Sequence, residues 1–154
     1  MIDRHHFFMQ EAIKEAQKAA FDDEVPVGAV IVHQGAVIAR GYNQIERLKD
    51  PTAHAEMLAL TSATNYLGAK WLNQASVYVT IEPCSMCAGA MVLARVKELY
   101  FGAKDPKTGA CGSLFNIANS KKLNHRIKIK GGILAKECGD LLSEFFKKKR
   151  DRRN

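Results

Sequence analysis

One histidine and two cysteines in the middle of the chain have the residue types and the spacing to bind a transition metal. Cys84 and Cys87 form a CxxC pair, about thirty positions after His54. An imidazole and two thiolates suit a tetrahedral Zn²⁺ ion, and three protein ligands leave one coordination position for water. The spacing therefore predicts a catalytic zinc site, with one Zn²⁺ per subunit.

Glu56 is the predicted catalytic residue of this site. It follows His54 by two positions, so its carboxylate can move protons at the metal without binding it, while zinc lowers the pKa of water toward neutrality. A fourth protein ligand is not expected, because four further candidates are isolated in the sequence and lack CxxC or HxxxH spacing. They are His33, His125, Cys111 and Cys138. The two extra cysteines are expected to be ordinary core or loop residues.

HxE followed by PCxxC is the known signature of the zinc deaminases. In the chemistry it indicates, Glu56 accepts a proton from water, the resulting hydroxide attacks a ring carbon that bears an amino group, and Glu56 returns the proton so that ammonia leaves. The motif predicts hydrolytic deamination. It does not determine which base is deaminated.

The positions of apolar residues predict the elements that hold these side chains. We expect, in order, a helix over 3–21, a β-hairpin over 27–33 and 36–42, a helix from 52 or 53 to 67, a strand over 75–81, a helix over 85–95, a strand over 97–103, a half-buried strand over 125–131 with a basic face, and a helix over 133–150. Both halves of the metal motif then lie at helix N-termini.

Three features between these elements bear on the fold and the site. Gly28 indicates either the close approach of another group to the backbone, a substrate being one candidate, or a gap in packing. Residues 43–53 and 104–112 are predicted loops, and residues 113–124 fit a short helix or a strand equally well. The strand, helix and strand over 75–103 require parallel neighbours, so a mixed sheet with helices on both faces is predicted, in an α/β class with α/β/α layers.

Length and composition predict one domain, residues 1–154, in the cytoplasm. The hydrophobic content of 47% supports an ordinary core. No run approaches 18 apolar residues, and the N-terminus lacks a signal-peptide pattern, so no membrane association is expected. The net charge of +7 is concentrated in residues 147–154, which hold six basic residues and one acidic one. This tail is either a solvated helix end or a phosphate-binding segment.

Four segments carry a resemblance to a known family. They are residues 24–30 (EVPVGAV), 50–56 (DPTAHAE), 82–91 (EPCSMCAGAM) and 105–109 (DPKTG). The chain resembles the bacterial tRNA-specific adenosine deaminases, in the cytidine/deoxycytidylate deaminase superfamily, over nearly its whole length. The resemblance implies a five-stranded cytidine deaminase-like sandwich, a homodimer, and conversion of the wobble adenosine of a tRNA anticodon to inosine.

The same resemblance implies four substrate-binding residues: Asn43, Asp105, Lys107 and Phe145. Each has a structural alternative where the residues alone are considered. Asn43 can cap a strand end, Asp105 can form a turn before a proline, and Phe145 can belong to the core.

Two rival functions remain open at this point. The first is a guanine or cytosine/cytidine deaminase that acts on a free base or nucleoside. The second is a zinc module that binds nucleic acid without catalysis. The basic strand face and tail favour a tRNA anticodon stem-loop as the partner, because a free base needs no such charge.

Overall fold

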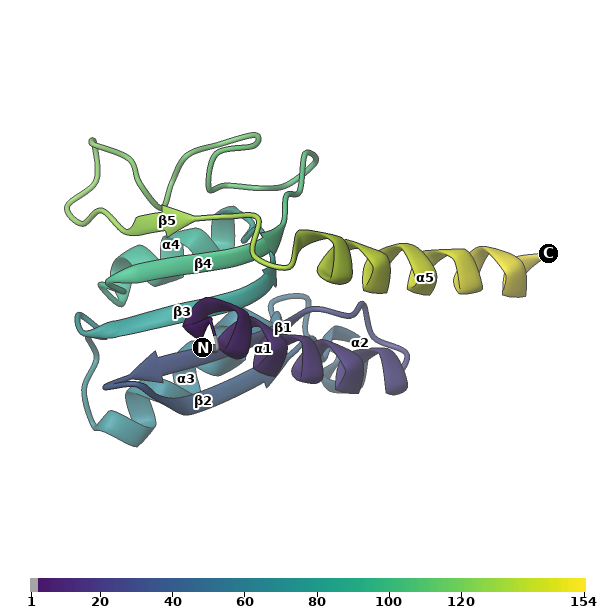
Figure 1. The fold of residues 1–154 in the computed structure, drawn as a ribbon, viewed down its shortest axis with the longest axis horizontal. Helices are drawn as coiled ribbons and strands as arrows, with labels where there is room; N and C mark the ends of the chain where they lie inside the picture. Colours follow the sequence, from purple (N-terminus) through teal and green to yellow (C-terminus); the bar gives the residue numbers. More distant parts are fainter. Residues whose placement is uncertain (1–2) are drawn as a thin grey trace.

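The structure is a computed structural model that describes residues 3–154, shown in Figure 1. Its elements, in chain order, are α1 (Arg4–Phe21), β1 (Gly28–His33), β2 (Ala36–Tyr42), α2 (Ile45–Leu48), α3 (Ala55–Leu67), β3 (Ala75–Ile81), α4 (Ser85–Leu93), β4 (Glu98–Ala103), β5 (Lys128–Lys130) and α5 (Ala135–Arg153). None of the helices within residues 3–154 is long and apolar enough to cross a lipid bilayer.

The five strands form one mixed sheet in the order β2-β1-β3-β4-β5. Strand β1 pairs antiparallel with β2 and with β3, whereas β3, β4 and β5 run parallel. The β1–β2 hairpin closes through Gln34 and Gly35, both with positive φ, which is the geometry of a tight two-residue turn. The predicted mixed sheet and its parallel β3–β4 pair are confirmed.

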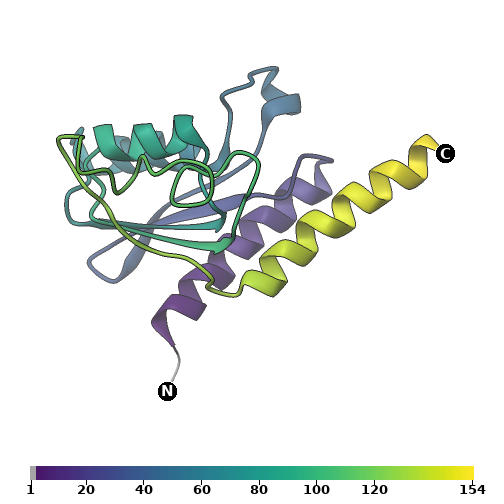
Figure 2. The same ribbon diagram turned by 90° about the horizontal axis from the view of Figure 1, so that it is seen from above.

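Helices cover both faces of this sheet, as Figure 2 shows. On one face, α1 and α5 lie side by side over alternate strand residues that include Val30, Tyr78 and Tyr100. On the other face, α3 and α4 pack on the intervening residues, including Ile31 and Val79. The alternation along each strand thus divides the core between two helical layers, and the predicted α/β/α sandwich is confirmed.

Two strand glycines let helix backbones approach the sheet closely. A Cβ atom on Gly28 would lie 2.1 Å from the carbonyl oxygen of Ala12 in α1, and one on Gly41 would lie 2.3 Å from that of Ala55 in α3. The close approach predicted at Gly28 is therefore made by a helix and not by a ligand. Gly41 matters more for the site, because it seats the first turn of α3 directly on β2.

Three boundaries differ from the prediction. The loop over 43–53 contains the short helix α2, and α3 begins at Ala55, so that His54 occupies its N-cap position. Strand β5 has three residues where seven were expected, because it is an edge strand that pairs only with β4. Residues 113–124 form turns, bends and one isolated bridge, from Asn116 to Cys111, and neither the helix nor the strand considered.

Candidate active site

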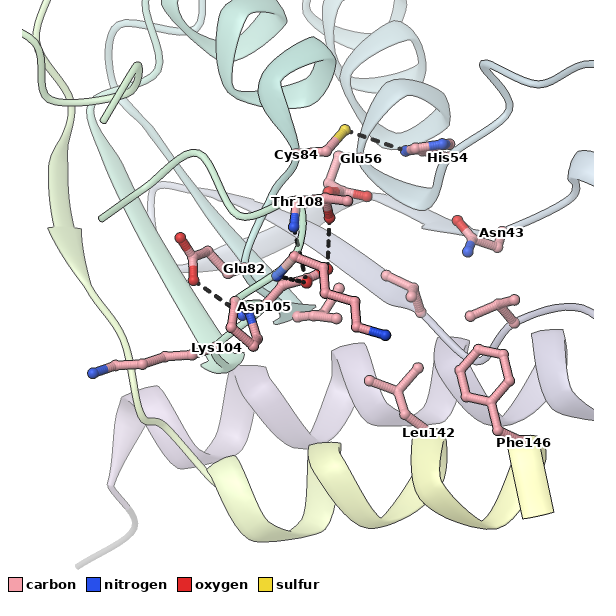
Figure 3. Close-up of a pocket in the computed structure, with 15 residues that line it drawn as sticks. Asn43, His54, Glu56, Glu82, Cys84, Lys104, Asp105, Thr108, Leu142 and Phe146 are labelled. Atoms are coloured by element: carbon pink, nitrogen blue, oxygen red, sulfur yellow. Dashed lines mark hydrogen bonds between the residues drawn. The ribbon is translucent and has the colours of Figure 1, made fainter. Parts of the chain in front are cut away.

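The predicted metal ligands lie at the N-termini of α3 and α4, which converge beside the end of β3 (Figure 3). His54 is the N-cap residue of α3 and Cys84 is the N-cap residue of α4, yet neither side chain caps its helix. Both side chains are consequently free to face a common point. Cys87 joins them from the first turn of α4, three positions after Cys84.

The distances between these ligands fit one metal ion. His54 Nδ1 lies 3.6 Å from Cys84 Sγ and 3.5 Å from Cys87 Sγ. The three ligand atoms all lie within 4.8 Å of one another. Within residues 3–154, no other group of three histidine, cysteine or acidic side chains is gathered in this way. The structure thus brings together the three residues selected by their spacing, and no fourth side chain joins them.

Hydrogen bonds within the group of His54, Cys84 and Cys87 shift the pKa values of all three side chains. Hydrogen bonds from Cys87 and then His54 lower the pKa of Cys84 to about 4, so this thiol is a thiolate at neutral pH. Each partner is affected in turn: its own hydrogen bond to Cys84 raises the pKa of Cys87 and, separately, that of His54. A metal cation binds thiolate and neutral imidazole, so its binding to this group would release protons.

Glu56 is the buried carboxylate of the site. It lies in the first turn of α3 and is only 3% exposed. Burial raises its pKa to about 7. Its Oε1 atom accepts no hydrogen bond from residues 3–154, although it is fully buried. A buried polar atom without a partner is unusual in a folded protein and points to a missing ligand or to a catalytic role.

A cavity of about 410 Å³ opens in front of these residues. His54, Glu56 and Cys84 lie on one side of it, and residues 104–108 form another side. Apolar side chains complete the wall: Val25, Val27, Ile81, Leu142 and Phe146. This volume and lining suit a flat, base-sized ligand that needs a few polar contacts for its orientation.

Asn43 lines this cavity and also caps α3. Its Oδ1 accepts a hydrogen bond of 2.9 Å from the amide of Ala55, the first residue of α3. The Nδ2 group is thereby left for a ligand, as its orientation in Figure 3 shows. Asn43 thus caps the start of α3 and not a strand end, and its contact with a substrate stays a prediction.

Asp105 and Lys107 also line the cavity, as expected, but the Asp105 carboxylate is occupied within its own turn. It accepts hydrogen bonds from the amides of Lys107 and Thr108 and one of 2.7 Å from the Thr108 hydroxyl. The turn-forming alternative for Asp105 is therefore present in the structure. Lys107 is exposed at the cavity and its ammonium group is available to a ligand.

The expectation for Phe145 needs correction, because the cavity is lined by its neighbour. Phe145 is 7% exposed and packs beside Leu141 and Ala20, in the seam between α5 and α1. Phe146 lines the cavity instead. Adjacent helical residues point about 100° apart, so only one of the two can face the site.

Sequence analysis also missed the apolar wall and Glu82. The apolar wall comes from three separate segments, so no local pattern marks it. Glu82 is 2% exposed and lines the cavity. The feature of the sequence that could have indicated Glu82 is its place: an acidic residue at the end of an apolar strand, directly before Pro83 and Cys84.

Comparisons with known proteins agree with this geometry. The MafB19-like deaminase family matches residues 2–150. The tRNA-specific adenosine deaminase of Bacillus subtilis (strain 168) is 48% identical over 146 residues, which cover 95% of this chain and 91% of that protein.

Two solved structures are similar to this one. A structure from work on A-to-I editing by tRNA:A34 deaminases at the wobble position of transfer RNA has a TM-score of 0.85 at 43% identity, covering 88% of this chain and 99% of that chain. A guanine deaminase from Bacillus subtilis has a TM-score of 0.64 at 38% identity, covering 71% of this chain and 70% of that chain.

The layered sheet and the group of His54, Cys84, Cys87 and Glu56 define a deaminase with the cytidine deaminase-like fold. The bound substrate is not determined by this class. The similarity to the Bacillus subtilis protein extends over nearly all of both chains. This chain belongs to the tRNA-specific adenosine deaminase family.

Proposed function

We propose that this chain is a zinc-dependent hydrolase that converts adenosine to inosine at the wobble position of a tRNA anticodon. One observation carries the proposal: a metal-binding triad and a buried carboxylate with an unpartnered oxygen face a base-sized cavity. The family relationship supports the choice of adenosine in tRNA as the substrate.

Zn²⁺ is the ion that best suits the donor set. Zinc bonds of about 2.0 Å to nitrogen and 2.3 Å to sulfur would place the two donors about 3.5 Å apart in a tetrahedral site. The distances from His54 Nδ1 to the two sulfurs, 3.6 and 3.5 Å, agree with this value. His54, Cys84 and Cys87 would hold one ion, which when bound lowers the pKa of water and so supplies a nucleophile at neutral pH.

Glu56 moves the protons in the proposed reaction. Its Oε1 atom, which has no partner within residues 3–154, accepts a proton from the attacking water. The carboxylic acid then donates this proton to ring nitrogen N1, next to the attacked carbon C6. The remaining proton of the same water, now on the hydroxyl group at C6, passes through Glu56 to the amino group. The bond between C6 and the amino nitrogen then breaks, C6 becomes a carbonyl, and ammonia leaves. Adenosine and water thus give inosine and ammonia.

Asn43 and the apolar wall would orient the base. The Asn43 Nδ2 group is the free donor of a side chain that is itself fixed by its bond to Ala55. Phe146 and Leu142 reach the cavity from α5 and offer flat and aliphatic surfaces for the ring. A base in an anticodon loop is already unstacked, so its transfer into such a pocket costs little.

Positive charge around the cavity suits an RNA and not a free base. Lys107 is exposed at the cavity, and the last turns of α5 carry Arg150, Arg152 and Arg153. These groups would contact phosphates of the anticodon stem-loop. Residues 147–154 are proposed to act as this phosphate-binding tail of a single catalytic domain.

Deamination of guanine or cytidine is the rival function, since the same catalytic group would serve it. We would incubate the zinc-loaded protein with an anticodon stem-loop, guanine and cytidine, and measure ammonia from each. Inosine in the stem-loop is read as guanosine after reverse transcription. Ammonia and a guanosine reading from the stem-loop alone are expected. Turnover of guanine or cytidine without turnover of the stem-loop would contradict the proposal.

We also propose that the protein is a homodimer that works in the cytoplasm, where tRNA is found. Large apolar side chains exposed on α4 and on the loop between β4 and β5 support a protein interface: Leu93, Leu114 and Phe115 are 80%, 52% and 53% exposed. Light scattering coupled to gel filtration tests the oligomeric state, and a monomer at micromolar concentration would contradict the dimer.

A further inference from the structure

Glu82 holds an irregular loop against the end of β3, and every hydrogen bond recorded for its carboxylate comes from that loop. Its Oε1 accepts hydrogen bonds from the amide of Asp105, at 3.1 Å, and from the Ser113 hydroxyl. Its Oε2 accepts from the amides of Cys111, at 3.1 Å, and Ser113, at 3.0 Å. Four hydrogen-bond donors of residues 105–113 therefore converge on the carboxylate of Glu82, a residue that is only 2% exposed.

The backbone of the same loop lies in close contact with Glu82. A Cβ atom on Gly109 would lie 2.4 Å from Oε2 and Cδ of Glu82, so any other residue would push the loop away. The amide of Ala110 donates to the carbonyl oxygen of Pro83 at 2.8 Å, and Gly109 forms an isolated bridge with Cys84. The loop is thus attached to the segment that leads into the metal ligand Cys84.

This attachment sets the position of one side of the cavity. Asp105, Lys107 and Thr108 line the cavity from within the loop, which has no regular secondary structure to hold it (Figure 3). The metal ligand Cys84 follows Glu82 by two residues in the chain, so it lies next to the point where the loop is attached. The carboxylate therefore ties the loop side of the cavity to the metal-binding side.

We propose that Glu82 is a positioning residue for the deamination reaction. It acts through residues 105–113, and fixes their distance from the metal ligands so that the cavity fits the target nucleoside. Glutamine cannot replace it fully, since its amide nitrogen would face hydrogen-bond donors and leave them unmatched. This inference rests on the proposed function for its kinetic consequence, but not for its structural one.

Two variants and one control separate positioning from simple stability. Glu82→Gln keeps the size of the side chain, and Ser113→Ala removes one donor while leaving the three amides. Glu98→Gln is the control, because the Glu98 carboxylate also accepts hydrogen bonds from side chains, the hydroxyl groups of Ser76 and Tyr100. Glu98 is only partly buried, and it lies at the start of β4, away from residues 105–113.

Kinetics on an anticodon stem-loop, expressed per bound zinc, give the first readout. We expect Glu82→Gln to raise KM about tenfold with a smaller change in kcat, because hydrogen bonds to a charged group are lost from the loop and not from the reacting atoms. Ser113→Ala should raise KM by a smaller factor, and Glu98→Gln should leave KM unchanged. An unchanged KM in Glu82→Gln, or loss of zinc alone, would overturn the inference.

Amide hydrogen exchange gives a second readout that needs no turnover. In Glu82→Gln, the amides of residues 105–113 should exchange at least about tenfold faster than in the wild type, while those of β3 and β4 keep their protection. Equal exchange of the loop in Glu82→Gln and Glu98→Gln would overturn the positioning role. If the wild type does not deaminate the stem-loop, the proposed function fails, and the exchange experiment still decides the role of Glu82.

Discussion

The rings of Phe145 and Phe146 lie edge to face, with their centroids 5.4 Å apart, yet they belong to different parts of the molecule. Phe145 fills the seam between α5 and α1, whereas Phe146 is 43% exposed and lines the cavity. The pair joins the core of the α1–α5 layer to the wall of the site.

Alanine substitutions should separate these two roles. Phe145→Ala should lower the free energy of unfolding by about 3 kcal/mol, because it removes a buried aromatic ring. Phe146→Ala should change the free energy of unfolding by less than about 1 kcal/mol and raise KM for the stem-loop about tenfold, since it removes a surface on which a base can stack. Urea denaturation and steady-state kinetics measure the two effects. If Phe145→Ala raised KM and Phe146→Ala lowered the free energy of unfolding, Phe145 would be the substrate contact.

Glu56→Ala should abolish turnover without releasing the metal. General acid–base catalysis by one side chain contributes roughly 10² to 10⁴ in rate, so kcat should fall by about that factor. Zinc content should stay at that of the wild type, because the three ligand atoms belong to other residues. Elemental analysis of the purified variant provides the check. Loss of zinc would show that Glu56 is a ligand and contradict its assigned role.

Removal of residues 147–154 should weaken binding of the stem-loop and reduce its dependence on salt. Each lost phosphate contact should lower the slope of log K against log salt concentration by about 0.7 to 0.9. Fluorescence anisotropy between about 50 and 200 mM salt measures both quantities. A matched control replaces the six basic residues of the segment by glutamine, which keeps the length of α5. Identical affinity and slope in all three proteins would mean that the tail is only solvated.

The two cysteines outside the metal site should be unreactive in the folded protein. Burial raises the pKa of Cys111 and that of Cys138 to about 12. At pH 8, roughly one thiol in 10⁴ is then a thiolate, which is the reactive form. Mass spectrometry after brief treatment with N-ethylmaleimide should find neither residue labelled until guanidinium is added. Rapid labelling of Cys138 in the native protein would show that α5 detaches from β4.

Glu98 should make stability depend on pH in the acidic range. Burial opposes its ionisation, but hydrogen bonds from Tyr100 and then Ser76 outweigh burial, so its pKa lies below the ordinary value of 4.5. Its contribution is therefore complete above about pH 4.5 and is lost as the pH falls through the lowered pKa. It should amount to less than about 1 kcal/mol, since the group is only partly buried and solvent screens its interactions.

Urea midpoints of the wild type and Glu98→Gln, measured from pH 3 to pH 7, test this dependence. The difference between the two proteins should shrink at the acidic end. Any release of zinc at low pH affects both proteins and cancels in the comparison. A constant difference over the whole range would contradict the prediction.

Much of the fold could be predicted because the decisive patterns are local. The alternation in β3, the two-residue turn of the β1–β2 hairpin and the small apolar face of α4 each lie within a dozen residues. The metal ligands were equally local in origin, since CxxC and HxE place them at helix starts. Only the convergence of the two helices depends on the tertiary structure.

The elements that were missed depend on contacts between distant residues. Helix α2 forms where the buried carboxylate of Glu24 accepts hydrogen bonds from the amides of Glu46 and Arg47, at 3.0 and 2.8 Å. No pattern within residues 43–53 predicts that partner. The choice between Phe145 and Phe146 is similar, because it depends on how α5 is rotated against α1.

The capping of α3 by Asn43 has a consequence for assembly of the protein. His54 begins the helix without capping it, and the amide of Ala55 instead bonds to a side chain twelve positions upstream, directly after the end of β2. A peptide that contained only α3 and its histidine would lack this partner and would fray at the end that binds the metal. A chain that has all three ligands but an undocked β1–β2 hairpin should therefore bind zinc poorly. Docking of the hairpin would then precede metal binding when the protein folds.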